Sequence, residues 1–401
     1  MAYTTTTKTS YGQRLSGSLK GIVTGFVLFI VATIALFWNE GNFVKGKRAI
    51  GDAQKNVTIV KDVSTIDNGL DGKLIHASAM ANTGDTLTDN LFGISISAIA
   101  IEKEVEYFQY VEQASSQSKD KIGGGQETVT TYTYRKEWVS QPVNSNKFED
   151  PAYQLSNSVL ANIESTKQTA DNVSFGAYRL PSFMIHSISG SVNLDFVLSD
   201  EKIQEWQKLL GERTKLAQND SAVRMIHQSG NVIYLGKSPA TPEIGDLRIT
   251  FTKIVPKEIS IIGKVQNNTF EQYVSKNGKT FSKVNTGNVS ADLMFNEAHS
   301  SNSTRAWIIR IIGILFVVWG LRSMFSILPT LFKVLPFLSN IVSAGIGLVC
   351  TVGGFAWSLI IISIAWLFYR PLIGIPMLLA AIAGIWYLKK RAKEKKAMNN
   401  E

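Results

Sequence analysis

The sequence predicts an α+β membrane protein. It is expected to have four transmembrane helices, one N-terminal and three C-terminal, with a large, mostly β extracytoplasmic domain between them. Three apolar runs lie between residues 307 and 388, and an uncharged run of 18 residues lies at 21–38. The long region between these runs is polar and rich in turn signals. Because a helix needs about 20 mostly apolar residues to cross a hydrocarbon core of about 30 Å, we expect lipid to surround the apolar runs.

The first predicted span, 21–38, follows a polar segment, 1–20, with three basic and no acidic residues. A secretory signal peptide also combines a basic start with an apolar run. Here the run is longer than a usual signal core and no Ala-x-Ala cleavage pattern follows it, so we expect an uncleaved anchor. Gly21 and Gly25 form a GxxxG motif, which can let two helices approach closely. They are therefore candidates for helix packing and dimerisation.

Three further spans are predicted near the C-terminus, at 307–328, 341–368 and 372–388. The middle one holds 28 residues and not one formal charge. A soluble helix of that length, apolar on every face, would be exceptional. This run is the strongest single indication that the chain is a membrane protein.

The distribution of charge predicts the orientation. The chain carries a net charge of +9, but residues 39–305 hold 28 basic and 30 acidic residues. The excess of positive charge therefore belongs to the membrane flanks, which removes the main support for nucleic-acid binding. The basic tail, 389–401, is expected in the cytoplasm by the positive-inside rule. Four crossings then place 1–20 and the loop 329–340 in the cytoplasm, and 39–306 outside it.

The extracytoplasmic region, 39–306, is expected to fold as a β-rich domain. The only cysteine of the chain, Cys350, lies in the third predicted span, so this domain can form no internal disulfide. Two arms of a long hairpin are predicted at 102–112 and 128–140, since aromatic side chains alternate along each. The glycines at 123–125 are expected to form a mobile hairpin tip.

Shorter strands and two helices complete the predicted domain. Apolar or β-branched segments between turn signals predict strands at 56–63, 73–81, 91–101, 231–235, 246–254, 258–266 and 278–284. Asp150-Pro151 is expected to begin a helix whose apolar face reaches Ile163. Ser199-Asp200 is expected to begin another that ends at Gly211. We expect both helices to pack on the core of the domain.

No pattern in the sequence points to catalysis or to a cofactor. The four histidines are scattered without metal-ligand spacing, whereas a metal site needs clustered ligands. No nucleophile motif is found. Glu102, Glu104 and Glu106 alternate onto one face, as they would on a solvated strand. We therefore predict no catalytic residue, no metal site and no cofactor.

Three arginines near the C-terminal spans are more informative. Arg310 and Arg322 are separated by about 18 Å along a helix at about 1.5 Å per residue, less than the hydrocarbon thickness. At least one should lie below the interface, where a charge costs a few kcal/mol unless it snorkels or finds a partner. The interpretations are snorkelling, a helix–helix contact or a lipid-headgroup site. Arg370 and Pro371 form a short turn, and Arg370 is expected to cap the helix that ends at Phe368 and to hold the hairpin of the last two spans.

Several short strings occur in a defined order along the chain. They are Asn39-Glu40-Gly41, Val105–Glu112, Tyr134–Trp138, Gly245–Arg248, Ser301-Asn302-Ser303 with Trp307, and Trp366–Pro371. Together with the layout of one plus three spans they resemble the transmembrane protein 43 (LUMA) family. The resemblance implies a four-span protein of the endoplasmic reticulum and inner nuclear membrane that organises membrane protein complexes, helps maintain envelope structure and self-associates. It carries over no catalytic residue. The Thr-rich start departs from the family.

We therefore expect a non-enzymatic integral membrane scaffold that organises membrane protein complexes and helps maintain membrane or envelope structure. Its expected partners are membrane lipids, other membrane proteins and further copies of the chain, and not nucleic acid. The alternatives are a channel or transporter component formed by oligomerised spans, and a membrane-bound enzyme. Residues 341–388 contain no acidic or amide side chain, which disfavours an ion pathway. We expect the bacterial cytoplasmic membrane, or the endoplasmic reticulum and inner nuclear membrane if the source is eukaryotic.

Overall fold

The computed structural model describes residues 2–214, 223–372, 374–376 and 379. Within them three helices are long and apolar enough to cross a membrane. These helices are α1 (Tyr11–Asn56), α4 (Ala291–Met324) and α6 (Pro336–Tyr369). Two short elements, α5 (Ile327–Leu331) and the 3-10 helix η4 (Phe332–Val334), join α4 to α6. Most of the predicted fourth span and the whole basic tail lie outside the described residues.

Helix α1 is much longer than the predicted span. It has 46 residues, a length of about 69 Å at about 1.5 Å per residue. Residues 39–56, which we assigned to the β-rich domain, are therefore the second part of this helix. Beyond the apolar run the helix continues because Ala49, Ile50 and Ala53 are buried on one side of it. This packing outweighs the cost of about 1 kcal/mol for each glycine inside the helix.

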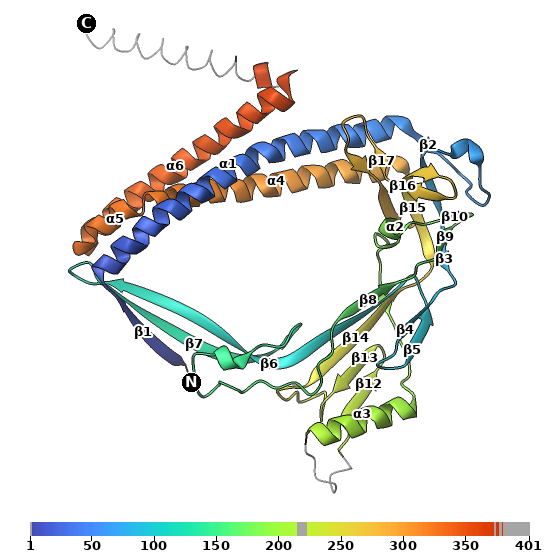
Figure 1. The fold of residues 1–401 in the computed structure, drawn as a ribbon, viewed down its shortest axis with the longest axis horizontal. Coiled ribbons are helices and arrows are strands. Elements are labelled where there is room, and N and C mark those ends of the chain that lie inside the picture. The colour runs from blue at the N-terminus through green and yellow to red at the C-terminus, as the bar shows by residue number, and fades with distance from the viewer. Residues whose placement is uncertain (1, 215–222, 373, 377–378, 380–401) are drawn as a thin grey trace.

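Small residues let the long helices approach one another. A side chain at Gly25 of α1 would come within 2.6 Å of the Gly320 carbonyl oxygen of α4. Farther along the same contact, Leu36 fills the space left by Gly313. Helix α6 reaches α4 where Gly354 lies against Val318. Figure 1 shows α1 and α4 side by side along most of their length.

The rest of the described chain forms two larger sheets, two strand pairs and two short helices. The first sheet has the order β1-β7-β6-β14-β13-β12, with β8 beside β6 and β11 beside β14. Its strands are β1 (Tyr3–Thr9), β6 (Ala100–Asp120), β7 (Gln126–Val139), β8 (Thr166–Thr169), β11 (Val192–Asn193), β12 (Ile226–Ser229), β13 (Val232–Leu235) and β14 (Leu247–Ile254).

The second sheet has the order β10-β9-β3-β15-β16, with β2 beside β3 and β19 beside β15. Its strands are β2 (Val57–Ile59), β3 (Leu74–Thr83), β9 (Val173–Phe175), β10 (Tyr178–Arg179), β15 (Lys257–Gln266), β16 (Thr269–Glu271) and β19 (Lys283–Thr286). The strand pairs are β4 (Thr86–Asp89) with β5 (Ile94–Ser97), and β17 (Tyr273–Val274) with β18 (Thr280–Phe281). The short helices are α2 (Ser182–Ile185) and α3 (Asp200–Arg213).

Most of the predicted strands, and the helix that begins at Ser199, occur within a few residues of their expected bounds. The segment 91–101 is not one strand, because β5 pairs with β4 and β6 begins only at Ala100. The helix predicted after Asp150 is absent from the described chain. Leu155 has a positive φ of 61°, and Asn157 bonds the backbone of β6 at Tyr110. The segment therefore packs across the hairpin in an irregular conformation.

The long helices and the second sheet share an apolar core. Ile50 and Ala53 of α1 are buried in one cluster with Met294 and Phe295 of α4 and with Ile262 of β15. Both helices therefore continue past their apolar spans into the domain. As a consequence, the domain is attached to two helices through a packed core as well as through the covalent chain.

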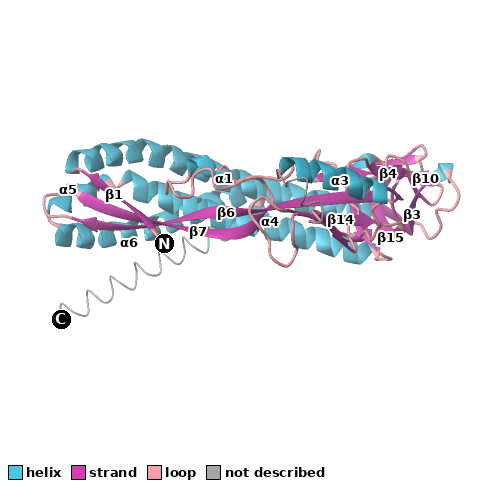
Figure 2. Cartoon of the chain, turned by 90° about the horizontal axis from the view of Figure 1, so that it is seen from below, coloured by secondary structure: helices cyan, strands magenta, loops and turns pink. Residues whose placement is uncertain are grey.

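The hairpin of β6 and β7 returns to the far end of the long helices. Figures 1 and 2 show it running along the direction of α1 and α4 toward α5 and the start of α1. There β1 pairs with β7 from Tyr3 opposite Tyr132 to Thr9 opposite Gln126. The hairpin tip therefore lies against the N-terminal segment of the same chain.

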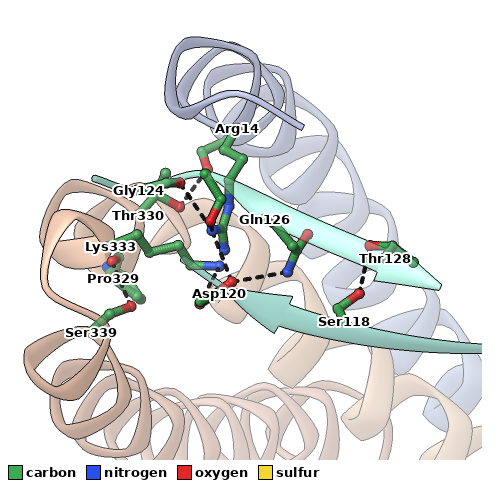
Figure 3. A network of polar contacts seen from close by, with 12 residues as sticks. Arg14, Ser118, Asp120, Gly124, Gln126, Thr128, Pro329, Thr330, Lys333 and Ser339 are labelled. Atoms are coloured by element: carbon green, nitrogen blue, oxygen red, sulfur yellow. Dashed lines mark hydrogen bonds and ion pairs between the residues drawn. The ribbon is translucent and has the colours of Figure 1, made fainter. Parts of the chain in front are cut away.

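Polar contacts hold the tip in this place (Figure 3). Asp120 is 2.8 Å from the buried guanidinium of Arg14 and 3.8 Å from the Lys333 ammonium. Arg14 also donates to the Gly124 carbonyl at 3.1 Å, and the Gly123 amide donates to the Val334 carbonyl at 3.1 Å. The predicted mobile tip is thus in contact with α1 and η4.

Candidate functional site

A charged group of side chains lies between α1, α4 and α6. The Glu40 side chain is completely buried, and Arg310 is 7% exposed. Arg310 Nε lies 2.5 Å and Nη2 lies 2.8 Å from the two carboxylate oxygens of Glu40. Trp366 Nε1 donates to Glu40 Oε2 at 2.8 Å. Bidentate, charge-assisted hydrogen bonds of this kind are among the strongest in proteins. This group therefore joins three helices at one point.

A second arginine extends the group, which we call the Glu40 cluster (Glu40, Arg310, Trp366, Arg370 and Phe43). The guanidinium of Arg310 lies 5.3 Å from the centre of the Phe43 ring. The guanidinium of Arg370 lies 4.6 Å from the same centre. Such cation–π contacts stabilise a desolvated cation. The Arg370 amide donates to the Trp366 carbonyl at 2.8 Å, and α6 ends just before Arg370.

The surroundings of the Glu40 cluster add further links between the same helices. Asn39 donates from its side chain to the Ala306 carbonyl of α4 at 3.1 Å. Arg48 donates to the Tyr369 carbonyl at 3.0 Å, and the Tyr369 ring fills the space beside Gly41. The guanidinium of Arg310 also lies 4.7 Å from the centre of the Trp307 ring. Three strings that lie far apart in the chain, 39–41, Trp307 and 366–371, therefore meet in space.

Of the predicted arginines, Arg310 and Arg370 come together, and Arg322 lies apart from them. Sequence reasoning expected at least one of Arg310 and Arg322 to lie below the membrane interface but did not find Glu40 as a partner. The available signal was that Glu40 is the only acidic residue within the first 51 positions, directly after an apolar run. A buried cation and a single nearby carboxylate on different spans indicate an ion pair between helices.

The remaining predicted positions lie along the helix contacts. Arg322 donates to Thr351 Oγ1 at 2.9 Å and to the Gly347 carbonyl at 3.3 Å, both on α6. Ser323 donates to the Gly21 carbonyl at 2.8 Å. Gly25 lies against α4 of the same chain, as described above. Pro371 is exposed directly after Arg370, where the chain becomes helical again.

A second polar group lies in the first sheet, where the other strings meet. The Arg248 guanidinium is 2.7 Å from Glu106 and 4.6 Å from the centre of the Trp138 ring. Next to them the Tyr234 hydroxyl donates to the buried Asp246 carboxylate, and the Glu243 amide donates to the same oxygen at 2.8 Å. Burial raises the pKa of Asp246, although the bond from Tyr234 acts in the opposite direction.

Two of the histidines and the Glu40 carboxylate are engaged in local contacts. No group of three or more His, Cys, Asp or Glu side chains that could hold a metal occurs in the described part of the chain. His76 bonds the Val289 carbonyl and His227 bonds the Arg224 carbonyl, so both serve local structure. In the Glu40 cluster the carboxylate oxygens already accept three bonds.

The comparisons with known proteins agree with the layout of helices and sheets. The family model described as transmembrane protein 43 matches residues 107–371. Human transmembrane protein 43 is 26% identical, over 98% of this chain and 95% of its own length. The mouse protein is 26% identical over 90% of this chain and 87% of its own. A homolog from Drosophila melanogaster is 27% identical over 91% of this chain and 93% of its own. No solved structure is similar to this chain.

These relatives bear on the predicted compartment. All three are animal proteins, so they give no support to the preference for a bacterial membrane. The three long apolar helices and the match over most of the chain establish an integral membrane protein with transmembrane helices. The chain belongs to the transmembrane protein 43 family.

Proposed function

We propose that this protein is a non-enzymatic membrane scaffold that binds other membrane proteins, or copies of itself, and organises them at the membrane. The observation that carries the proposal is the Glu40 cluster. It fixes three apolar helices relative to one another, and two of these helices continue into the core of the domain. Spans and domain then form one rigid platform, which is what the assembly of partners requires.

The outer faces of the helices provide a surface for such partners. Val23, Val27 and Val31 of α1 and Trp307 and Leu315 of α4 are exposed along the apolar spans. In a bilayer these faces meet either lipid or the helices of another protein. Association between helices in lipid is driven by packing and by hydrogen bonds rather than by removal from water. A rigid set of exposed faces favours a defined partner.

The test is purification of the full chain from its own membrane in a mild detergent. Co-purifying proteins are identified, and the mass of the complex is measured. The proposal expects membrane proteins or further copies of this chain in stoichiometric amount. The variant Glu40→Gln should lose them, whereas Arg305→Gln, which changes an exposed cation on α4, should retain them. A lone monomer with turnover on a substrate would overturn the proposal.

The second candidate, a channel or transporter component, is favoured by one observation. The β6–β7 hairpin carries hydroxyl side chains along its outer half, such as Ser116 bonded to Thr130 and Ser118 bonded to Thr128. In Figure 1 it spans the same length as the apolar part of α1 but lies apart from it, and it meets the helices only at its tip. Non-helical backbone at membrane depth is tolerated only where it is buried or lines a water-filled cavity. Ion flux into liposomes that contain the purified chain tests this candidate, and the scaffold proposal expects none.

A further inference from the structure

The loop end of the helices contains a cavity that the proposed scaffold function does not use. It has a volume of about 920 Å³ and opens to the outside between α1, α4, α5 and α6. Two cations, Arg322 and Lys333, line it, and none of its described lining residues is acidic. The Ser343 hydroxyl also lines it, whereas the hydroxyls of Thr330 and Thr351 donate to backbone carbonyls four residues earlier. This cavity, which we call the Arg322 cavity, therefore presents two cationic side chains and the Ser343 hydroxyl together.

Arg322 is held in position from one side only. Its Nη2 atom donates to Thr351 Oγ1 at 2.9 Å and to the Gly347 carbonyl at 3.3 Å. These neutral acceptors orient the guanidinium and leave its charge unbalanced, because no carboxylate pairs with Arg322 among the residues that the structure describes. The planar fork of an arginine matches the oxygens of a phosphate group.

The second cation is also available to an anion. Lys333 Nζ lies 3.8 Å from Asp120 Oδ2. Arg14 Nη1 lies closer to the same carboxylate, 2.8 Å from Asp120 Oδ1. Asp120 is therefore already paired through its closer contact (Figure 3). Around the polar lining, Leu348 is 67% exposed and Ile341 and Phe325 are exposed as well. Charged and apolar surfaces thus lie next to each other at the end of the apolar helices.

We propose that the Arg322 cavity binds the phosphate of an anionic phospholipid whose acyl chains lie along the exposed faces of α4 and α6. A soluble phosphate compound would gain nothing from the apolar surface, whereas a lipid uses both. Basic pockets between transmembrane helices on the cytoplasmic side are typical sites for anionic headgroups. The proposal rests on the predicted orientation, in which this end of α4 faces the cytoplasm, and it goes beyond the scaffold function.

Native mass spectrometry of the full chain in detergent tests the site. The chain is titrated with phosphatidylglycerol and, separately, with phosphatidylcholine of the same acyl chains. We expect at least a fivefold preference for phosphatidylglycerol. The double variant Arg322→Gln, Lys333→Gln should bring this preference close to one. The matched control, Arg305→Gln with Lys47→Gln, removes two exposed cations at the other end of α4 and α1 and should keep it.

The other outcomes overturn the proposal. Equal binding of both lipids by the unchanged chain, or an unchanged preference in the double variant, shows that the cavity is not the site. Displacement of phosphatidylglycerol by millimolar inorganic phosphate shows a site for free anions and not for lipid. If the double variant does not fold, a photoactivatable phosphatidylglycerol on the unchanged chain decides the question. Adducts within 341–351 are expected, and adducts spread evenly over all helices contradict the site.

Discussion

At the scale of single residues, the Glu40–Arg310 pair explains how a charge can lie within a predicted span. An isolated charge at membrane depth costs a few kcal/mol or more, and a buried pair avoids this cost only if its remaining atoms are also bonded. Trp366 supplies a third bond to the carboxylate. The chain spacing of Arg310 and Arg322 predicted that at least one of them should lie below the interface, where it either snorkels or finds a partner. The identity of that partner depended on how the helices pack.

The first prediction concerns this pair. Glu40→Gln or Arg310→Met alone should destabilise the fold by about 3–5 kcal/mol, because each leaves a buried polar group without its counterpart. The combined variant Glu40→Met, Arg310→Met should cost less than the two single changes added together. Apparent melting temperatures of the full chain, followed by circular dichroism in one detergent, measure the effect. Arg305→Gln serves as the control. Additive losses would show that the two side chains do not act as a pair.

A second prediction concerns pH and Asp246. Burial raises the pKa of this carboxyl above its ordinary value of 3.8, so the folded state favours the protonated form. Its contribution to stability is therefore fully present below the unfolded-state pKa and is lost as pH rises through the folded-state pKa. The melting temperature of the unchanged chain, relative to Asp246→Asn, should fall between pH 4 and pH 7. A relative rise over that interval would mean that the carboxylate is stabilised in the fold.

At the scale of elements, the sequence predicts the long apolar helices and most strands, because uncharged runs and alternating side chains are local signals. It does not predict the continuation of α1 to Asn56, which depends on contacts with α4 and with β15. The prediction of a helix after Asp150 was wrong for the same reason, because contacts with another element decide the conformation of this segment. Its apolar residues suit a helix, but Tyr153 stacks on Tyr134 of β7 at 4.0 Å between ring centres. Only the folded hairpin provides that surface.

The third prediction concerns the contact of α1 with α4. Gly25→Ala should destabilise the chain by about 1–3 kcal/mol, since the added carbon would lie 2.6 Å from the Gly320 oxygen and 2.8 Å from the Met324 nitrogen. Gly17→Ala is the matched change on the same helix, where nothing lies within 4 Å. It should be neutral or stabilise by up to about 1 kcal/mol. Equal melting temperatures of the two variants would contradict this close contact.

At the scale of the whole molecule, the position of the hairpin tip conflicts with a topology in which lipid separates the domain from the N-terminal segment. The tip contacts Arg14 and Val334, in segments that the topology places across the membrane from the domain. A polar hairpin cannot cross hydrocarbon, because its backbone edge would be exposed to lipid. The contacts of the tip therefore require that the hairpin be shielded from lipid, either by protein or by a water-filled path. The sequence could not reveal this conflict, because the pairing of β1 with β7 is a long-range contact.

The fourth prediction follows from this conflict. Ile122 at the tip is 89% exposed, and in an Ile122→Cys, Cys350→Ser variant a membrane-impermeant thiol reagent reports its side. The contacts of the tip with Arg14 and Val334 predict labelling from the side of the N-terminal segment. Ion flux together with this labelling would indicate a water-filled path around the hairpin, and labelling from the side of the domain would contradict the contacts of the tip. The variant with Cys350→Ser alone gives the background.

The central claim is that the apolar part of α1 crosses the bilayer once and separates the N-terminal segment from the domain. The most direct measurement places a single cysteine at Thr5 or at Val197, which is 92% exposed in the domain, on the Cys350→Ser background. Both variants are labelled with the impermeant reagent in sealed vesicles of known orientation. We predict that the two positions react from opposite sides of the membrane. Reaction of both from the same side would contradict the account.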